Sequence, residues 1–259
     1  MKIALVDSGI GLLPAAAALR ELRPDADLVV SCDPDGMPWG PRTTADLTEH
    51  ALACARAAAE HRPDALVVAC NTATVHALDA LRAELEPGIP VIGTVPAIKP
   101  AAAGGGKVAI WATPATTGSA YQRGLIEEFG GGAEITEVPC PGLADAVEHA
   151  DRAALERAIG AAAALTPAGV EVLVLGCTHY ELVGDLIRAA VAPQAAPDLV
   201  LLGSADAVAA QALRRIAPQA LARTGSGTLT VLLTGRPGEL PAAAGAYPQG
   251  RSLLAAAVV

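Results

Sequence analysis

The segment KIALVDS at residues 2–8 is an apolar run that ends in an acidic residue and a hydroxyl. The segment KVAIWAT at residues 107–113 resembles it. A second pair, LVVACNT at 66–72 and LVLGCTH at 173–179, is separated by nearly the same offset. Strands that are apolar throughout are typical of parallel sheets covered on both faces. The two matches therefore predict two similar α/β halves.

Short apolar runs alternate with Ala-rich segments along most of the chain, which predicts a doubly wound α/β fold. We expect strands at 3–6, 27–31, 65–69, 90–93, 108–111, 134–138, 172–175, 199–202 and 229–233. We expect helices at 12–22, 44–60, 75–86, 117–129, 152–165, 180–190 and 205–216. The prediction is two similar parallel-sheet domains with the active site in the cleft between them. Residues 1–96 with 207–259 form the first domain, and residues 97–206 form the second.

The composition argues against several classes of partner. The chain has 259 residues and a net charge of −9, so it lacks the excess of cations that a nucleic-acid or anionic membrane surface requires. Although 52% of the residues are hydrophobic, no uncharged run approaches the ~20 residues of a membrane-spanning helix. Asp7 interrupts the place where a signal peptide would continue its apolar region. We expect a cytoplasmic protein without nucleic-acid or membrane partners.

Two of the five cysteines stand out by position. Cysteines occur at 32, 54, 70, 140 and 177, an odd count with no C-x-x-C pair, so neither a disulfide framework nor a zinc ribbon is indicated. Cys70 and Cys177 each follow a predicted strand and precede a predicted helix. The remaining three are expected to be small buried hydrophobes.

The positions of Cys70 and Cys177 predict a particular chemistry. Ligands of open parallel sheets bind at the carboxyl ends of the strands, and a helix N-terminus lowers the pKa of a thiol. If the two halves face each other, the two sulfurs flank one pocket. A base on one face of a carbon and an acid on the other can invert a stereocentre, and two thiols can exchange these roles.

Polar residues beside both thiols are candidates for assisting them. Asp7 could direct a proton near Cys70, and His179 could do so near Cys177. Hydroxyl, amide and backbone N–H groups that suit substrate carboxylates come from Ser8, Asn71, Thr72, Thr116 and Thr178. Each of these residues also has a purely structural interpretation. A cysteine at a strand end can be a small buried residue of the core, Asp7 can cap the following helix, and His179 can be a solvated residue at the start of a helix.

Several segments resemble the signature segments of glutamate racemases and occur in that family's order over nearly the whole chain. They are DSGIG at 7–11, PWG at 38–40, ACNTA at 69–73, VPAIKPA at 95–101, Thr113 with Thr116, GCTHY at 176–180 and LTG at 233–235. The resemblance implies a cofactor-independent isomerase of two α/β domains that forms a homodimer and interconverts L- and D-glutamate for peptidoglycan synthesis.

The resemblance also implies roles for individual residues. Cys70 would act on the D-isomer and Cys177 on the L-isomer, with assistance from Asp7, His179 and Glu148. Contacts with the substrate glutamate would come from Asp7, Ser8, Trp39, Gly40, Asn71, Thr72, Thr178 and His179. The chain departs from the family pattern at Leu12, usually glycine, at Trp39, usually tyrosine, and at Glu181, usually proline. These departures bear on substrate range and efficiency more than on the type of reaction.

Alternative functions remain open on the sequence alone. A racemase of the same superfamily could act on aspartate or another amino acid, although His179 favours glutamate. An NAD-binding oxidoreductase is suggested by Gly9 and Gly11 after a strand and by Asp33 after the next, but Pro14 occupies the third glycine position. A pyridoxal-phosphate enzyme would need a Schiff-base lysine. The chain has only Lys2, Lys99 and Lys107, of which Lys2 and Lys107 precede strands, away from any expected site. A binding module without activity is the remaining alternative.

Overall fold

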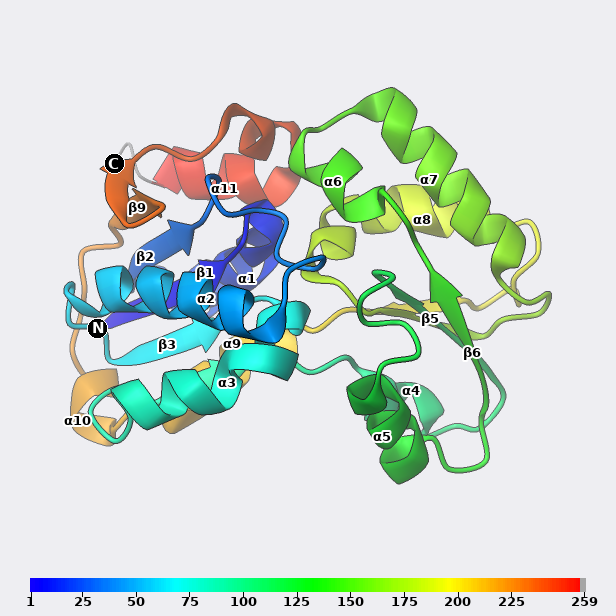
Figure 1. Ribbon diagram of the computed structural model, residues 1–259, viewed down its shortest axis with the longest axis horizontal. Coiled ribbons are helices and arrows are strands. Elements are labelled where there is room, and N and C mark those ends of the chain that lie inside the picture. The colour runs from blue at the N-terminus through cyan, green and yellow to red at the C-terminus, as the bar shows by residue number, and fades with distance from the viewer. Residues whose placement is uncertain (257–259) are drawn as a thin grey trace. The chain divides into compact units, whose positions relative to one another are not determined.

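The computed structural model describes residues 1–256, which form two compact units. Unit 1 comprises Met1–Val95 and the chain from Ala205 onward, and unit 2 comprises Pro96–Ser204. Each unit contains its own sheet of mainly parallel strands with helices packed against it (Figure 1). The predicted α/β class, with parallel sheets in two domains, is confirmed.

The sheet of unit 1 has six strands in the order β10-β9-β2-β1-β3-β4, and β10 alone is antiparallel to its neighbour. The strands are β1 (Lys2–Asp7), β2 (Asp27–Cys32), β3 (Ala65–Val68), β4 (Val91–Gly93), β9 (Leu229–Leu233) and β10 (Arg236–Gly238). The chain passes from β1 to β2 on one side and then returns to β3 on the other. The order of strands therefore reverses between β1 and β3, and the carboxyl ends of strands at such a switch point are where α/β proteins bind ligands.

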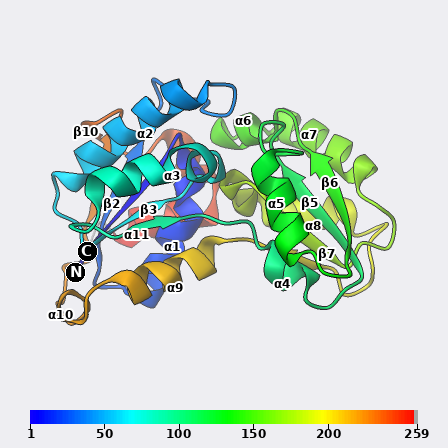
Figure 2. The ribbon, with the colours of Figure 1, turned by 60° about the horizontal axis from the view of Figure 1, so that its bottom comes forward.

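Helices cover both faces of this sheet. They are η1 (Ile10–Leu12), α1 (Leu13–Leu22), α2 (Thr44–Ala59), α3 (Asn71–Leu85), α9 (Ala205–Arg215), α10 (Pro218–Leu221), η3 (Ala242–Ala246) and α11 (Pro248–Ala256). Helices α2 and α3 lie side by side on one face, and α1 packs with α9 and α11 on the other (Figure 2). Ala51, Ala55, Ala73 and Ala77 are fully buried where α2 and α3 meet the sheet. Much of the alanine excess thus lies in a core whose small side chains let helices approach closely.

The sheet of unit 2 repeats the same arrangement with four parallel strands in the order β6-β5-β7-β8. The strands are β5 (Lys107–Ala112), β6 (Glu134–Pro139), β7 (Val172–Leu175) and β8 (Val200–Leu202). The order reverses between β5 and β7, so Cys177 after β7 corresponds to Cys70 after β3. Strand β6 is an exception to the expected burial: it forms the edge of the sheet, and most of its residues are partly exposed.

The helices of unit 2 are α4 (Ile98–Ala102), α5 (Ala120–Phe129), α6 (Leu143–Glu148), α7 (Arg152–Leu165), η2 (Thr178–Val183) and α8 (Gly184–Val191). Helix α7 has the predicted bounds, because Asp151 caps it by accepting a hydrogen bond from the Ala154 N–H at 3.0 Å. The helix expected at 180–190 is instead the 3₁₀ segment η2 followed by α8. Helices α4 and α6 were not expected, because one or two turns are too short to show a helical period.

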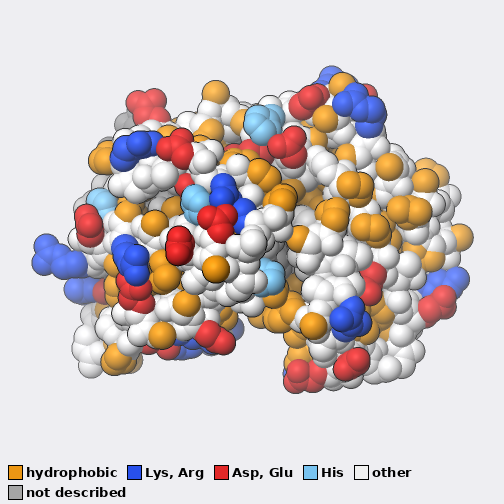
Figure 3. Space-filling view, in the orientation of Figure 1, with side chains coloured by type: hydrophobic (Ala, Val, Ile, Leu, Met, Phe, Trp, Pro, Cys, Tyr) orange, Lys and Arg blue, Asp and Glu red, His pale blue; other side chains and the backbone are white. Residues whose placement is uncertain are grey.

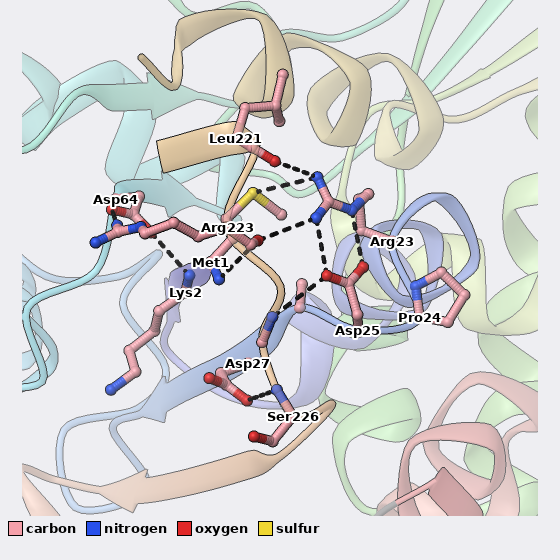
Figure 4. A network of polar contacts seen from close by, with 12 residues as sticks. Met1, Lys2, Arg23, Pro24, Asp25, Asp27, Asp64, Leu221, Arg223 and Ser226 are labelled. Carbon is pink, nitrogen blue, oxygen red and sulfur yellow. Dashed lines mark hydrogen bonds and ion pairs between the residues drawn. The ribbon is translucent and has the colours of Figure 1, made fainter. Parts of the chain in front are cut away.

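A polar network joins the start of the chain to the segment before β9 (Figure 4). The Met1 ammonium donates to the Arg223 carbonyl at 3.2 Å, and Arg23 forms two 2.8 Å hydrogen bonds with Asp25. The guanidinium holds the pKa of the Asp25 carboxyl well below its usual range. The network lies at the amino ends of the strands of unit 1, the edge opposite to the one that carries Cys70.

Two surface properties bear on the expected partners. None of the helices within residues 1–256 is long and apolar enough to cross a bilayer. On the face drawn in Figure 3, Lys and Arg side chains are interspersed with Asp and Glu side chains. That face therefore lacks the continuous basic stripe that phosphate backbones require.

Candidate active site

Cys70 lies at the N-terminus of α3, the helix that follows β3 in the sheet of unit 1. Its backbone is extended (φ −140°, ψ 120°), and its Sγ accepts a hydrogen bond from the Ala73 N–H at 3.5 Å, so the thiol is the N-cap of α3. The side chain is 7% exposed. Amide groups and the positive end of a helix dipole stabilise a negative charge on sulfur. The environment of Cys70 thus suits a group that alternates between thiol and thiolate.

Asp7 lies at the end of the strand adjacent to Cys70. Strands β1 and β3 pair Val6 with Val68, and the Ala69 N–H donates to the Val6 carbonyl at 2.9 Å. The Asp7 side chain is fully buried, and its Oδ1 accepts from the Ser8 N–H at 2.7 Å. The structure therefore brings Asp7, Ser8 and Cys70 to the same edge of one sheet, as the sequence predicts for adjacent strands.

Asn71, the only asparagine in the chain, starts helix α3 directly after Cys70. It is 5% exposed, and neither atom of its side-chain amide has a hydrogen-bond partner among the described residues. Buried polar groups are rarely left in this state, because an unmet hydrogen bond costs about 1–3 kcal/mol. An unpartnered amide beside a reactive thiol is a ready donor and acceptor for a ligand. Thr72 follows it and is half-buried.

Trp39 does not present its ring as an exposed wall of a pocket. The side chain is 1% exposed, packs in the same cluster of buried residues as Cys70, and donates from Nε1 to Asp33 Oδ2 at 2.9 Å. The indole N–H of Trp39 is therefore bonded to a carboxylate of its own unit. Gly40, which follows, is partly exposed.

In unit 2, Cys177 belongs to a chain of three side chains. Its backbone matches that of Cys70 (φ −138°, ψ 135°), but η2 follows it, and within residues 1–256 no N–H caps its sulfur. The Sγ lies 4.0 Å from His179 Nδ1, and His179 Nε2 lies 2.8 Å from Glu148 Oε2. Because an ionised carboxylate only accepts, the proton of a neutral imidazole resides on Nε2. The lone pair on Nδ1 then faces the thiol and can take its proton.

Further polar groups lie at the same edge of the sheet of unit 2. Thr178 is 5% exposed, and Thr116, which is 4% exposed, has its hydroxyl 3.3 Å from that of Thr113. Tyr180 is fully buried and donates to the Cys140 carbonyl at 3.3 Å. Burial raises the pKa of Tyr180 well above its usual range, so it remains a neutral phenol beside Cys177.

Two other cysteines have environments that oppose ionisation. Burial, reinforced by the charge of Asp33, raises the pKa of Cys54 to about 12. Burial likewise raises the pKa of Cys140 to about 12, with a smaller contribution from the nearby Cys177. Both groups are thiols at neutral pH, as expected for core filler. Cys32 is also buried and donates to the Gly9 carbonyl at 3.3 Å.

The remaining departures from the racemase pattern are accommodated inside the units. Leu12 is fully buried in η1, so its side chain packs in the core. Glu181 accepts hydrogen bonds at 2.8 Å from both the N–H and the hydroxyl of Ser204. Two hydrogen-bond donors of Ser204, the last residue of unit 2, therefore stabilise the negative charge of Glu181.

The residues predicted from sequence gather into one group in each unit. Unit 1 brings Asp7, Ser8, Cys70, Asn71 and Thr72 to the switch point between β1 and β3. Unit 2 joins Glu148, His179 and Cys177. The described residues contain no cluster of three or more side chains suited to holding a metal ion. The sequence did not reveal the contacts that Asp33 makes with Thr234 and His50. The ribose-binding role considered for Asp33 would need a carboxylate that is available to a ligand, whereas the Asp33 carboxylate contacts side chains of its own unit.

Comparisons with known proteins point in one direction. The family model described as Asp/Glu/Hydantoin racemase matches residues 14–212. Glutamate racemase from Roseiflexus sp. strain RS-1 is 36% identical over 245 residues, covering 91% of this chain and 88% of that protein. The Herpetosiphon aurantiacus enzyme of the same name is 35% identical over 246 residues, covering 91% and 93%. The structure of Escherichia coli glutamate racemase in complex with L-glutamate and the activator UDP-MurNAc-Ala matches with a TM-score of 0.77 at 27% identity, covering 98% of this chain and 94% of that chain.

Proposed function

Because the chain belongs to the Asp/Glu/hydantoin racemase family, we propose that it interconverts L- and D-glutamate by proton transfer between the α-carbon and two cysteines, without a cofactor. The observation that carries this proposal is that Cys70 and Cys177 occupy equivalent positions in the two sheets. Cys70 follows β3 and Cys177 follows β7, and in each sheet this is the strand next to the point where the strand order reverses. Two thiols, one in each unit, suit a reaction in which the acid and the base exchange roles when the direction reverses.

The proposed reaction is symmetrical. With L-glutamate bound, the Cys177 thiolate removes the α-proton, the electron pair remains on the substrate as a carbanion, and the Cys70 thiol donates its proton to the opposite face. The product is D-glutamate, and the protein is left with a Cys177 thiol and a Cys70 thiolate. Reaction of D-glutamate runs the same steps in reverse, so no net proton is gained or lost.

Neighbouring groups would keep each sulfur ready for its role. On the Cys177 side, His179 accepts the thiol proton at Nδ1, and Glu148 stabilises the resulting imidazolium through Nε2. On the Cys70 side, the Ala73 N–H stabilises the thiolate, and Asp7 directs the proton. Proton transfer by positioned side chains typically accelerates a reaction by about 10²–10⁴-fold.

Substrate recognition would use neutral donors. Asn71 offers an amide with unmet hydrogen bonds, and Ser8, Thr72, Thr116 and Thr178 offer hydroxyl or backbone groups. Trp39 and Gly40 belong to the loop between β2 and α2, whose N–H groups can bind a carboxylate. We propose further that the D-glutamate serves cell-wall synthesis and that the enzyme is a cytoplasmic homodimer. Both of these proposals rest on the resemblance to glutamate racemases.

The decisive experiment is a chiral assay of the purified chain with no added cofactor. We expect L-glutamate and D-glutamate to converge on an equal mixture, with deuterium from D₂O entering the α-position, and L-aspartate to react much more slowly. Cys70→Ser and Cys177→Ser are each expected to lower racemisation by about 10²-fold or more. Cys32→Ser, which keeps a donor to the Gly9 carbonyl, is the matched control and should retain activity. Full activity in either of the first two variants would eliminate the two-thiol mechanism.

A further inference from the structure

A cluster of side chains around Asp33 lies outside the groups that the proposed reaction uses. Asp33 follows β2 and is 1% exposed, yet it carries a carboxylate. A buried charge is tolerated only where donors surround it. Asp33 Oδ2 accepts from Trp39 Nε1 at 2.9 Å and lies 2.8 Å from His50 Nδ1, and its Oδ1 accepts from the Thr234 hydroxyl at 3.1 Å.

These three donors come from three separate parts of unit 1. Trp39 lies in the loop between β2 and α2, His50 lies within α2, and Thr234 follows β9. The main chain adds further ties, because the Gly36 and Met37 N–H groups both donate to the Asp33 carbonyl, at 3.1 and 2.9 Å. A single acidic residue therefore fastens the loop to a helix and to a neighbouring strand.

Gly36 provides the space for this arrangement. A Cβ atom at residue 36 would lie 2.0 Å from Asp33 Oδ2 and 2.4 Å from His50 Nδ1. Any larger residue would thus displace the carboxylate or the imidazole. The Gly36 carbonyl also accepts from Arg42 Nε at 2.6 Å, and Arg42 pairs with Asp46 at 2.6 Å. Asp46 in turn lies 3.7 Å from His50 Nε2, which closes the network.

The network connects directly to the candidate active site of unit 1. The Asp33 N–H donates to the Ser8 carbonyl at 3.1 Å, and Trp39 packs in the same buried cluster as Cys70. A shift of the Trp39 ring would therefore disturb the buried cluster that includes Cys70, as well as the position of Gly40, which follows Trp39 in the chain. Small misplacements of binding groups have large effects on rate, because catalysis depends on geometry.

We infer that Asp33 is a positioning residue: it touches no substrate, but through Trp39 it holds Gly40 and the packing around Cys70 in the geometry that binds glutamate. This inference rests on the proposed function for its kinetic consequence. The Trp39–Asp33 hydrogen bond itself can be tested without any activity.

The kinetic test is a double-mutant cycle. Asp33→Asn and Trp39→Phe should each raise the KM for glutamate by about tenfold while kcat changes much less, because both thiols remain in place. The double variant should be no worse than the more severe single variant, because both changes break the same link. Trp111→Phe is the matched control: it removes an equally buried indole donor, which bonds to Thr166 at 2.9 Å in unit 2. Trp111→Phe should change the KM for glutamate only slightly, and its effect on KM should be additive with that of Asp33→Asn.

The spectroscopic test is independent of glutamate. The chain has two tryptophans, so a ¹⁵N–¹H spectrum should contain two indole N–H signals, which Trp39→Phe assigns. Asp33→Asn should move the Trp39 signal and leave the Trp111 signal in place. If Asp33→Asn fails to fold, Thr234→Val removes one donor from the same carboxylate and should move the Trp39 signal in its place.

The outcomes separate the two proposals. A wild-type chain that does not racemise glutamate overturns the proposed function, and a shifted Trp39 signal in Asp33→Asn would then still support the positioning contact. An unmoved Trp39 signal, or additive effects of Asp33→Asn and Trp39→Phe on KM, overturns the inference about Asp33 even in an active enzyme.

Discussion

The Nε2 atom of His179 lies 2.8 Å from Oε2 of Glu148, and both side chains are less than a tenth exposed. This contact joins the segment after β7 to helix α6, and both α7 and β7 lie between the two residues in the chain. It fixes both the direction and the protonation of the imidazole, since the acceptor faces Nε2 and leaves Nδ1 for Cys177. The arrangement makes Glu148 testable apart from its neighbours.

Glu148→Gln should keep the shape of this contact and lose its charge. The amide oxygen can still accept from Nε2, but the imidazolium that forms when His179 takes a proton loses its counter-charge. We expect kcat for racemisation to fall by about tenfold to 10²-fold. With α-deuterated substrates, the isotope effect should grow for L-glutamate, because the step assigned to Cys177 becomes slower.

Asp145→Asn is the control for that experiment. It removes the same charge from the same helix, but the Asp145 side chain is 71% exposed and should not affect activity. The two enantiomers have equal free energies in solution, so kcat/KM must stay equal in the two directions for every variant. A Glu148→Gln variant as active as Asp145→Asn would remove Glu148 from the mechanism.

Asn71→Ala should separate stability from binding. In the described chain the Asn71 amide makes no hydrogen bond, so its removal breaks none, and the free energy of unfolding should change by less than about 1 kcal/mol. The KM for glutamate should rise by about tenfold or more, because a ligand contact is lost. Urea denaturation and steady-state kinetics on the same preparation measure the two effects.

Gln122→Ala provides the opposite case. Gln122 is equally buried, and its Nε2 donates to Glu137 at 2.5 Å. Removing it should cost about 1–3 kcal/mol of stability and leave the KM unchanged. If Asn71→Ala behaved like Gln122→Ala, with lost stability and an unchanged KM, Asn71 would be a structural residue.

The sequence predicted the fold well because the fold rests on local patterns. The buried parallel strands are continuous apolar runs, and β1, β2, β3 and β5 were each located within a residue or two of their observed ends. Helix α3 was expected from residue 75 but begins at Asn71. The first turn of α3 is rich in residues of low helix propensity, and a cysteine rather than a serine or aspartate caps it.

The site was predictable only as far as its residues follow strand ends. Cys70, Asp7 and Cys177 could be placed in this way. The orientation of Trp39 could not, because it depends on a carboxylate six positions earlier and on His50 and Thr234, which reach it only in the folded unit. Loop contacts of this kind leave no periodic signal in a sequence.

Buried thiols should make stability depend on alkaline pH. Burial raises the pKa of Cys54 and of Cys140 to about 12, above the ~8.5 of an unfolded cysteine. Raising the pH past about 9 therefore ionises these groups only in the unfolded chain, and the free energy of unfolding should fall until the pH reaches about 12. Urea denaturation at pH 8 and pH 10 should show the decline. It should be shallower in Cys54→Ala/Cys140→Ala, and an equally steep decline would show that other groups cause it.

Glu181 and Gly203 should be energetically coupled. Glu181 receives two hydrogen bonds from Ser204, and a Cβ on residue 203 would lie 2.3 Å from Glu181 Oε2. Gly203→Ala must therefore push the carboxylate away from Ser204 and should cost about 1–3 kcal/mol of unfolding free energy. In a Glu181→Ala background the added methyl group meets no carboxylate, so the same change should cost much less. Urea denaturation of the four proteins in this cycle gives the coupling energy, and strictly additive effects would contradict the contact.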